Sequence, residues 1–174
     1  VLALILAGSG GGIFYWQMRA VASIISLDVN PSIELRLNRN GTVLSCKAMN
    51  RDAAAVLYEM GGGADLEGIK LDVAVNAIVG ALLRHGYLDS ISSAILISVE
   101  DSDQGRAARI QEELVTVVDT ALQMSSSQSA VYSQKLTVDA GMEIQAQNNN
   151  ISSGKAYMVN QVIALNSSLE FEAL

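Results

Sequence analysis

A long alternation of apolar and polar residues near the start of the chain limits the folds that are open to it. The alternation runs over residues 20–30, resumes over 32–38 and returns over 42–49, and such period-two patterns are typical of half-buried strands. Asn40-Gly41 separates the last two segments. This dipeptide is the strongest short signal for a hairpin with a type I′ turn, in which both central residues have positive φ. We therefore expect three strands joined by tight turns.

The rest of the chain mixes helical and strand patterns, which predicts an α+β domain with a mostly antiparallel sheet covered by helices. The β-branched run Ala94–Val99 is typical of a central strand that is buried on both faces. The other predicted elements are a helix over 51–60 with Asn50 as N-cap and a glycine run behind it, a helix over 71–84, a helix over about 103–124, a strand over 130–138, a helix over 140–147, a helix from Ser152 or Ser153 to Leu165, and a last turn over 169–174.

Composition excludes several classes of function. The 174 residues are 50% hydrophobic and carry a net charge of -7 without a basic cluster, which argues against nucleic acid as a partner. Cys46 and His85 are the chain's single cysteine and histidine. They provide neither zinc-ligand spacing nor a Ser-His-Asp set, and we expect Cys46 to be a small core residue. The sequence therefore predicts no cofactor and no metal.

Four acidic residues need an interpretation of their own: Glu34, Glu100, Asp101 and Asp103. A metal site near the last three is conceivable. We expect instead that the four charges are solvated or complement the dipole of the helix that follows, because no paired carboxylates for hydrolysis can be identified.

Residues 1–16 carry no charge and end in the aromatic cluster Phe14-Tyr15-Trp16, followed by Arg19. The segment is slightly shorter than the roughly 20 residues that span a bilayer, and its aromatic residues suit the membrane interface. We interpret residues 1–19 as the C-terminal part of a transmembrane helix and 20–174 as the domain outside the membrane. A signal-peptide apolar region and a buried N-terminal helix are the alternatives.

Asn30-Pro31 joins the first two predicted strands. Proline lacks an N–H group and is confined to strand starts, sheet edges and bulges, so we expect a kink or bulge at this bond. Asparagine usually deamidates through attack by the next backbone nitrogen, but the nitrogen of Pro31 carries no proton. The Asn30 carboxamide nitrogen can instead attack its own main-chain carbonyl carbon, which yields a C-terminal succinimide and frees Pro31. An N-to-O acyl shift would need Ser, Thr or Cys where Pro31 stands.

Two neighbours have candidate roles in that chemistry. Asp28 is predicted on the same strand face as Asn30, where it could orient the carboxamide or take a proton. Ser32 could donate a hydrogen bond to the developing oxyanion. The chemistry alone does not favour cleavage over a purely structural proline bulge.

Residues 22–35, which contain Asp28-Val29-Asn30-Pro31-Ser32-Ile33-Glu34 and lead into Asn38–Val43, resemble the extracytoplasmic domain of RsgI-like anti-sigma factors. The segments 94–99, 151–157 and 169–174 are similar to that family's central strand, C-terminal helix start and closing helix. The resemblance covers nearly the whole chain.

The resemblance implies a bacterial, single-pass membrane protein with its main domain extracytoplasmic. It implies self-cleavage at Asn30-Pro31, with no turnover of external substrates, and fragments that stay associated noncovalently. Separation of the fragments would let an intramembrane protease cut the membrane stub and release an alternative sigma factor. The sigma-binding cytoplasmic domain and a polysaccharide-binding sensor module, which many members carry, are both absent from these 174 residues. The alternatives are an uncleaved sensor or binding module and a scaffold domain of the cell envelope.

Overall fold

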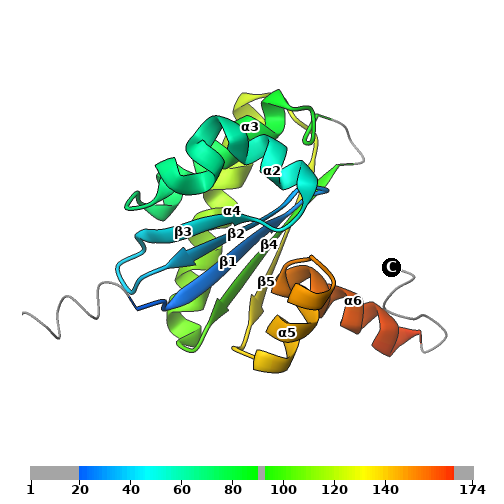
Figure 1. Cartoon of the computed structure of the whole chain (residues 1–174). Helices are drawn as coiled ribbons and strands as arrows, with labels where there is room; N and C mark the ends of the chain where they lie inside the picture. The colour runs from blue at the N-terminus through cyan, green and yellow to red at the C-terminus, as the bar shows by residue number, and fades with distance from the viewer. Residues whose placement is uncertain (1–19, 90–92, 167–174) are drawn as a thin grey trace, which may run out of the picture.

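A computed structural model describes residues 20–89 and 93–166, and they form one five-stranded sheet with helices on both faces (Figure 1). The elements, in chain order, are β1 Ser23–Asp28, β2 Ser32–Leu37, β3 Val43–Ala48, α2 Arg51–Leu57, the 3-10 segment η1 Tyr58–Leu66, α3 Leu71–Arg84, β4 Ala94–Asp101, α4 Gln104–Met124, β5 Ala130–Leu136, α5 Ala140–Asn148 and α6 Ser153–Leu165.

The strand order is β3-β2-β1-β4-β5, so the first strand of the chain lies in the middle of the sheet. β1 is antiparallel to both neighbours, β2 and β4. β4 and β5 are parallel and are joined through α4, as a crossover connection requires. The prediction of a mostly antiparallel α+β sheet is confirmed. The prediction for Ala94–Val99 is confirmed as well, since β4 has strand neighbours on both sides and is buried along nearly its whole length.

One face of the sheet carries the apolar core. Side chains that alternate along β1 and β2 point into it, and Ile25, Leu27, Ile33 and Leu35 are fully buried there. Helices α2, α3 and α4 cover this face and supply most of the remaining core residues. Cys46 is part of the same core, as predicted, and burial raises the pKa of its thiol to about 12, with a smaller contribution from Glu67.

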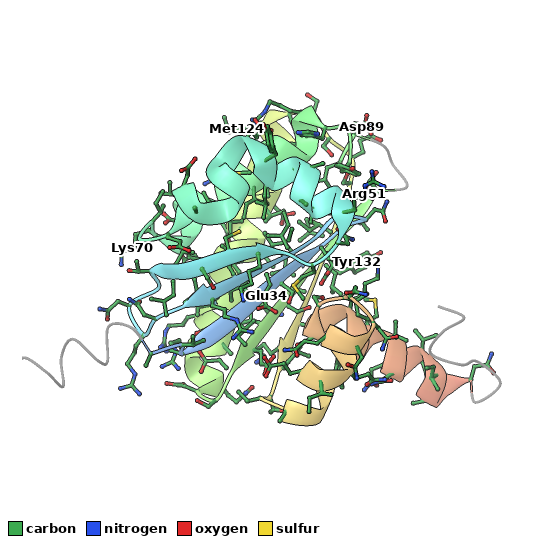
Figure 2. The ribbon with its side chains drawn as sticks, viewed as in Figure 1. Glu34, Arg51, Lys70, Asp89, Met124 and Tyr132 are labelled. Carbon is green, nitrogen blue, oxygen red and sulfur yellow. The ribbon has the colours of Figure 1, made fainter. Side chains whose placement is uncertain are left out.

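The opposite face is polar, and α5 and α6 cover part of it (Figure 1). Glu34 lies on this face (Figure 2), together with Ser26, Asp28, Ser98 and Glu100, and all five are buried. Gly154 lets α6 approach closely, because a Cβ atom at that position would clash with the Oγ atom of Ser98. The polar face of the sheet and the helices on it therefore enclose a second, smaller buried region.

The hairpin between β2 and β3 differs from the predicted type I′ turn. Gly41 has a φ of 69°, but Asn40 is not among the described residues with positive φ. The side chain of Asn38 accepts hydrogen bonds from the backbone of Asn40 and Thr42, at 2.9 and 3.0 Å. A loop closed by an asparagine side chain therefore replaces the two-residue turn, and glycine is needed at only one position.

The four acidic residues are predicted to be solvated or to complement a helix dipole, and solvation is wrong for three of them. Asp101 is fully buried, and Glu34 and Glu100 are 6% and 7% exposed. Asp103 behaves as predicted, since its side chain accepts from Arg106 N and caps α4.

The predicted transmembrane segment 1–19 and the predicted last turn at 169–174 lie outside the described residues. Within residues 20–89 and 93–166, the helices are all too short or too polar to cross a bilayer.

Candidate functional site

Asn30 and Pro31 lie in the tight turn that joins β1 to β2. Asp28 and Ser32 pair across the base of this turn, and the Val29 N–H donates to the Pro31 carbonyl oxygen at 2.9 Å. Asn30 is exposed, whereas Pro31 is buried. The predicted kink is thus a full reversal of the chain, and Asn30 stands at its tip and not on a strand face.

Both polar groups of Asn30 are held by one short segment, residues 50–52. The Asn50 Nδ2 donates to the main-chain carbonyl oxygen of Asn30 at 2.8 Å. The Asn30 Nδ2 donates to Asp52 Oδ2 at 3.2 Å. The carbonyl of the Asn30-Pro31 bond therefore accepts a hydrogen bond, and the candidate nucleophile faces a carboxylate.

The β2–β3 hairpin brings residues 50–52 to the turn. The register pairs Ile33 with Ala48, and the Met49 N–H continues the ladder by donating to the Ser32 carbonyl at 2.8 Å. The next residue, Asn50, therefore lies beside Pro31. Figure 2 labels Arg51, the first residue of α2, at this end of the sheet.

The side-chain oxygen of Asn50 has partners of its own. As the predicted N-cap of α2 it accepts from Ala53 N at 2.9 Å, and it also accepts from Ser32 N at 3.3 Å. The N-cap bond satisfies one of the free N–H groups at the helix start. It also fixes the orientation of the carboxamide, so that its NH₂ group points at the Asn30 carbonyl.

Asp28 faces the other way, into the polar interior under α6. Its Oδ2 accepts from Ser152 Oγ at 2.5 Å, while its Oδ1 has no hydrogen-bond partner. Burial raises the pKa of this carboxyl, and the hydroxyls of Ser152 and Ser32 and the charge of Lys155 oppose the rise. Asp28 is thus 5% exposed and is bonded to α6, while the Asn30 carboxamide is bonded to Asp52.

Ser32, the fourth predicted site residue, is fully buried at the start of β2. Its hydroxyl lies near enough to Asp28 to lower the pKa of that carboxyl, yet its Oγ forms no hydrogen bond of ordinary geometry. A buried hydroxyl without a partner is uncommon in folded proteins.

Sequence reasoning does not assign Asn50 or Asp52 to this site. It predicts Asn50 only as an N-cap and does not single out Asp52. A signal is available: an antiparallel hairpin centred on Asn40-Gly41 places residue 50 opposite residue 31, and the side chain at 52 follows shortly after it in the first turn of the helix.

Comparison with known proteins decides the family. Residues 22–161 match the model of the anti-sigma factor RsgI-like central domain. The chain belongs to the RsgI-like anti-sigma factor family. The matched range contains the turn at Asn30-Pro31, the segment 50–52 and most of α6, so the whole candidate site lies within the family domain.

Three RsgI relatives from Acetivibrio thermocellus show how much of a longer protein this domain represents. The chain is 26% identical to anti-sigma-I factor RsgI9 over 139 residues, 21% identical to RsgI7 over 141 and 23% identical to RsgI5 over 162. These matches cover 77%, 80% and 87% of the chain but only 19%, 25% and 32% of the respective relatives. The chain therefore spans about a fifth to a third of the length of the relatives that it matches.

Proposed function

We propose that this RsgI-like domain cuts its own backbone between Asn30 and Pro31. The hydrogen bonds on the two polar groups of Asn30 carry the proposal: the carbonyl accepts from Asn50, and the carboxamide nitrogen donates to Asp52. The tip of the turn also leaves Asn30 exposed. Exposure leaves space around Asn30 for the five-membered succinimide ring to form.

The proposed reaction balances without an outside reactant. The Asn30 Nδ2 attacks the Asn30 main-chain carbonyl carbon and loses one proton. The bond from that carbon to the Pro31 nitrogen breaks, and the nitrogen keeps the electron pair and gains the proton. The products are a succinimide at the end of residues 1–30 and a new N-terminus at Pro31. A later hydrolysis of the ring consumes one water. The reaction occurs once per chain, and no external substrate is turned over.

Asp28 and Ser32 belong to the proposed site as the pair that closes the turn. The Ser32 hydroxyl makes no ordinary hydrogen bond and lies one residue beyond the bond that would break, so we propose it as a donor to the oxyanion. Asp28, bonded to Ser152, is proposed to fix the base of the turn through α6.

At the level of the whole protein we propose a single-pass protein of the bacterial membrane. Residues 1–19 form the outer part of its transmembrane helix, and residues 20–174 lie outside the cell. The two fragments stay together until a stimulus, which could be polysaccharide bound by a sensor module, separates them. An intramembrane protease then cuts the stub, and the cytoplasmic domain releases an alternative sigma factor. Family membership supports this scheme, together with the central place of β1 in the sheet.

The test is intact-mass analysis of the purified chain with an Asn30→Ala variant beside it. We expect the wild type to give a fragment ending at residue 30, as the succinimide or its hydrolysis product, and a fragment beginning at Pro31. Asn30→Ala should stay whole, and Asn30→Asp should be cut far more slowly because it lacks the nitrogen nucleophile.

Asn40→Ala is the matched control, because Asn40 is also an exposed asparagine in a hairpin of the same sheet. This variant should be cut like the wild type. A wild-type chain that remains intact after prolonged incubation would refute self-cleavage and favour the uncleaved sensor or scaffold module.

A further inference from the structure

Cleavage by a carboxamide nitrogen poses two chemical problems. An amide nitrogen is a weak nucleophile that must lose a proton as it attacks, and the attacked carbonyl oxygen gains negative charge. Enzymes meet the first demand with a general base and the second with donors aimed at the oxygen. Both kinds of group are found next to Asn30 in this domain.

The base is Asp52. Its Oδ2 lies 3.2 Å from the Asn30 Nδ2 and accepts a hydrogen from it, a separation at the outer edge of the range from which a base removes a proton. The carboxylate comes from the second residue of α2, so its backbone is fixed by the helix.

The donor is Asn50. Its Nδ2 lies 2.8 Å from the Asn30 carbonyl oxygen, within the distance expected of a group that stabilises an oxyanion. Its Oδ1 is anchored to Ala53 N and Ser32 N. The donor is therefore pre-oriented and does not have to rotate into place during the reaction.

We infer that Asp52 and Asn50 are catalytic residues of the cleavage at Asn30-Pro31, an inference that rests on the proposed function. Asp52 takes a proton from Asn30 Nδ2 as the new N–C bond forms, and Asn50 stabilises the oxyanion. When the C–N bond to Pro31 breaks, the proton passes from Asp52 to the Pro31 nitrogen, directly or through water. Asp52 is a carboxylate again when this single reaction is complete, and each atom and charge is accounted for.

Two substitutions separate this chemistry from folding. Asp52→Asn keeps the size of the side chain but removes the base. Asn50→Asp keeps the oxygen that caps α2, and Asp is as good an N-cap as Asn, but it removes the donor and places a negative charge beside the developing oxyanion. Asp52→Glu restores a carboxylate and should recover much of the rate that Asp52→Asn loses.

The rate is measured on the full chain by pulse-labelled cell-free translation with labelled methionine, followed by gel and mass analysis over time. Met18 labels the short fragment and the other five methionines label the long one. We expect Asp52→Asn and Asn50→Asp each to slow cleavage by about 10²-fold or more, the usual effect of removing a general base or an oxyanion donor. Their thermal unfolding should match that of the uncut Asn30→Ala chain.

Asp72→Asn is the matched control, because Asp72 is the second residue of α3 as Asp52 is of α2. It should cleave at the wild-type rate. If Asp52→Asn and Asn50→Asp also cut at that rate while Asn30→Ala does not, the inference is overturned and the proposed cleavage stands. The assignment of Asp52 as the base is likewise overturned if Asp52→Glu is as slow as Asp52→Asn. If the wild type is never cut, the proposed function fails and the inference fails with it.

Discussion

Asn50 shows how one side chain can serve both the fold and the proposed reaction. Its oxygen accepts two backbone hydrogen bonds, from Ala53 and Ser32, and its nitrogen donates to the Asn30 carbonyl. Serine, threonine and aspartate also cap helices, but an amide combines an acceptor and a donor in one rigid plane. The amide of Asn50 can therefore cap α2 through its oxygen while its nitrogen contacts Asn30.

Asp28 predicts a dependence of stability on pH. Burial raises its pKa in the folded chain above the ordinary value of 3.8, so the folded state binds more protons than the unfolded state between these two values. The free energy of unfolding contributed by Asp28 therefore falls as the pH rises through this window. Asp28→Asn should remove that contribution while a partner for Ser152 remains.

The measurement is chemical unfolding of the Asn30→Ala chain, with and without Asp28→Asn, from about pH 4, near the ordinary carboxyl pKa, upward. The difference in unfolding free energy between the two should grow with pH in favour of Asp28→Asn. Two other carboxyls also make stability depend on pH. Burial raises the pKa of Glu100, and the hydrogen bond from Arg106 N lowers the pKa of Asp103. Both are present in the two chains, so their contributions cancel in the difference. A difference that does not change with pH would contradict the buried, protonatable state of Asp28.

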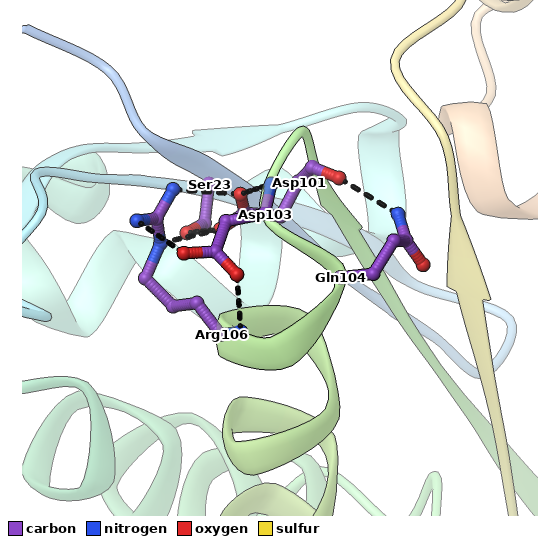
Figure 3. A network of polar contacts seen from close by, with 5 residues as sticks. All are labelled: Ser23, Asp101, Asp103, Gln104 and Arg106. Carbon is purple, nitrogen blue, oxygen red and sulfur yellow. Dashed lines mark hydrogen bonds and ion pairs between the residues drawn. The ribbon is translucent and has the colours of Figure 1, made fainter.

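Among the elements, β1 is fastened at both ends by buried carboxylates. At its start, Ser23 Oγ donates to Asp101 at 2.5 Å, and Arg106 of α4 binds the same carboxylate through two contacts of 2.7 Å (Figure 3). At its end, Asp28 accepts from Ser152 at the start of α6. The first strand is thus tied to helices on both faces of the sheet.

Arg106→Ala should destabilise the fold strongly. The substitution leaves Asp101, which is fully buried, without its cation, and the loss of one partner of a buried pair costs about 3–5 kcal/mol. Urea unfolding in the uncut Asn30→Ala background measures the effect on a single chain. Arg84→Ala is the control, because the Arg84 and Glu59 side chains are 60% and 40% exposed and such solvent-exposed pairs contribute little to stability. Equal losses in the two variants would show that Asp101 does not depend on Arg106.

The elements themselves could largely be predicted from the sequence, since their signals are local. The period of 3.6 and the glycine at position 86 define α3, and its bounds agree with the prediction. The errors lie where distant residues decide the outcome. Asp101 is buried because Ser23, 78 residues away, and Arg106 satisfy it. Asp28 points to Ser152, 124 residues away, and no local pattern encodes that contact.

At the scale of the whole molecule, the place of β1 in the sheet determines how firmly a cut domain would hold together. β1 pairs over six residues with β2 and over six with β4, and ladder hydrogen bonds run perpendicular to the strands. A pull along β1 from residue 20 would therefore load both ladders at once. The fully buried side chains of Ile25 and Leu27 also pack in the apolar core, and this packing has to be lost in the same step.

Ile25→Ala should therefore hasten the separation of the two fragments that the proposed cleavage would produce. Truncation of a buried isoleucine costs about 2–5 kcal/mol, and each 1.4 kcal/mol is about a factor of ten in an equilibrium constant. A tag on the N-terminal fragment and a wash series on the cut protein would measure its retention. Ile24→Ala is the control, since Ile24 lies on the opposite face and is only partly buried. Equal retention of the two variants would show that packing in the apolar core does not hold the N-terminal fragment in place.

The central position of β1 would also make the proposed signal irreversible. Once β1 leaves, β2 and β4 each lose the strand that lay between them. Each then has one edge whose backbone N–H and C=O groups are unpaired. The peptide bond cannot be remade, and exposed edges readily pair with other strands. Each molecule could then signal only once, and the cell could reset the response only by making new copies. The output would reflect the total number of domains opened so far and not the strength of the stimulus at a given moment.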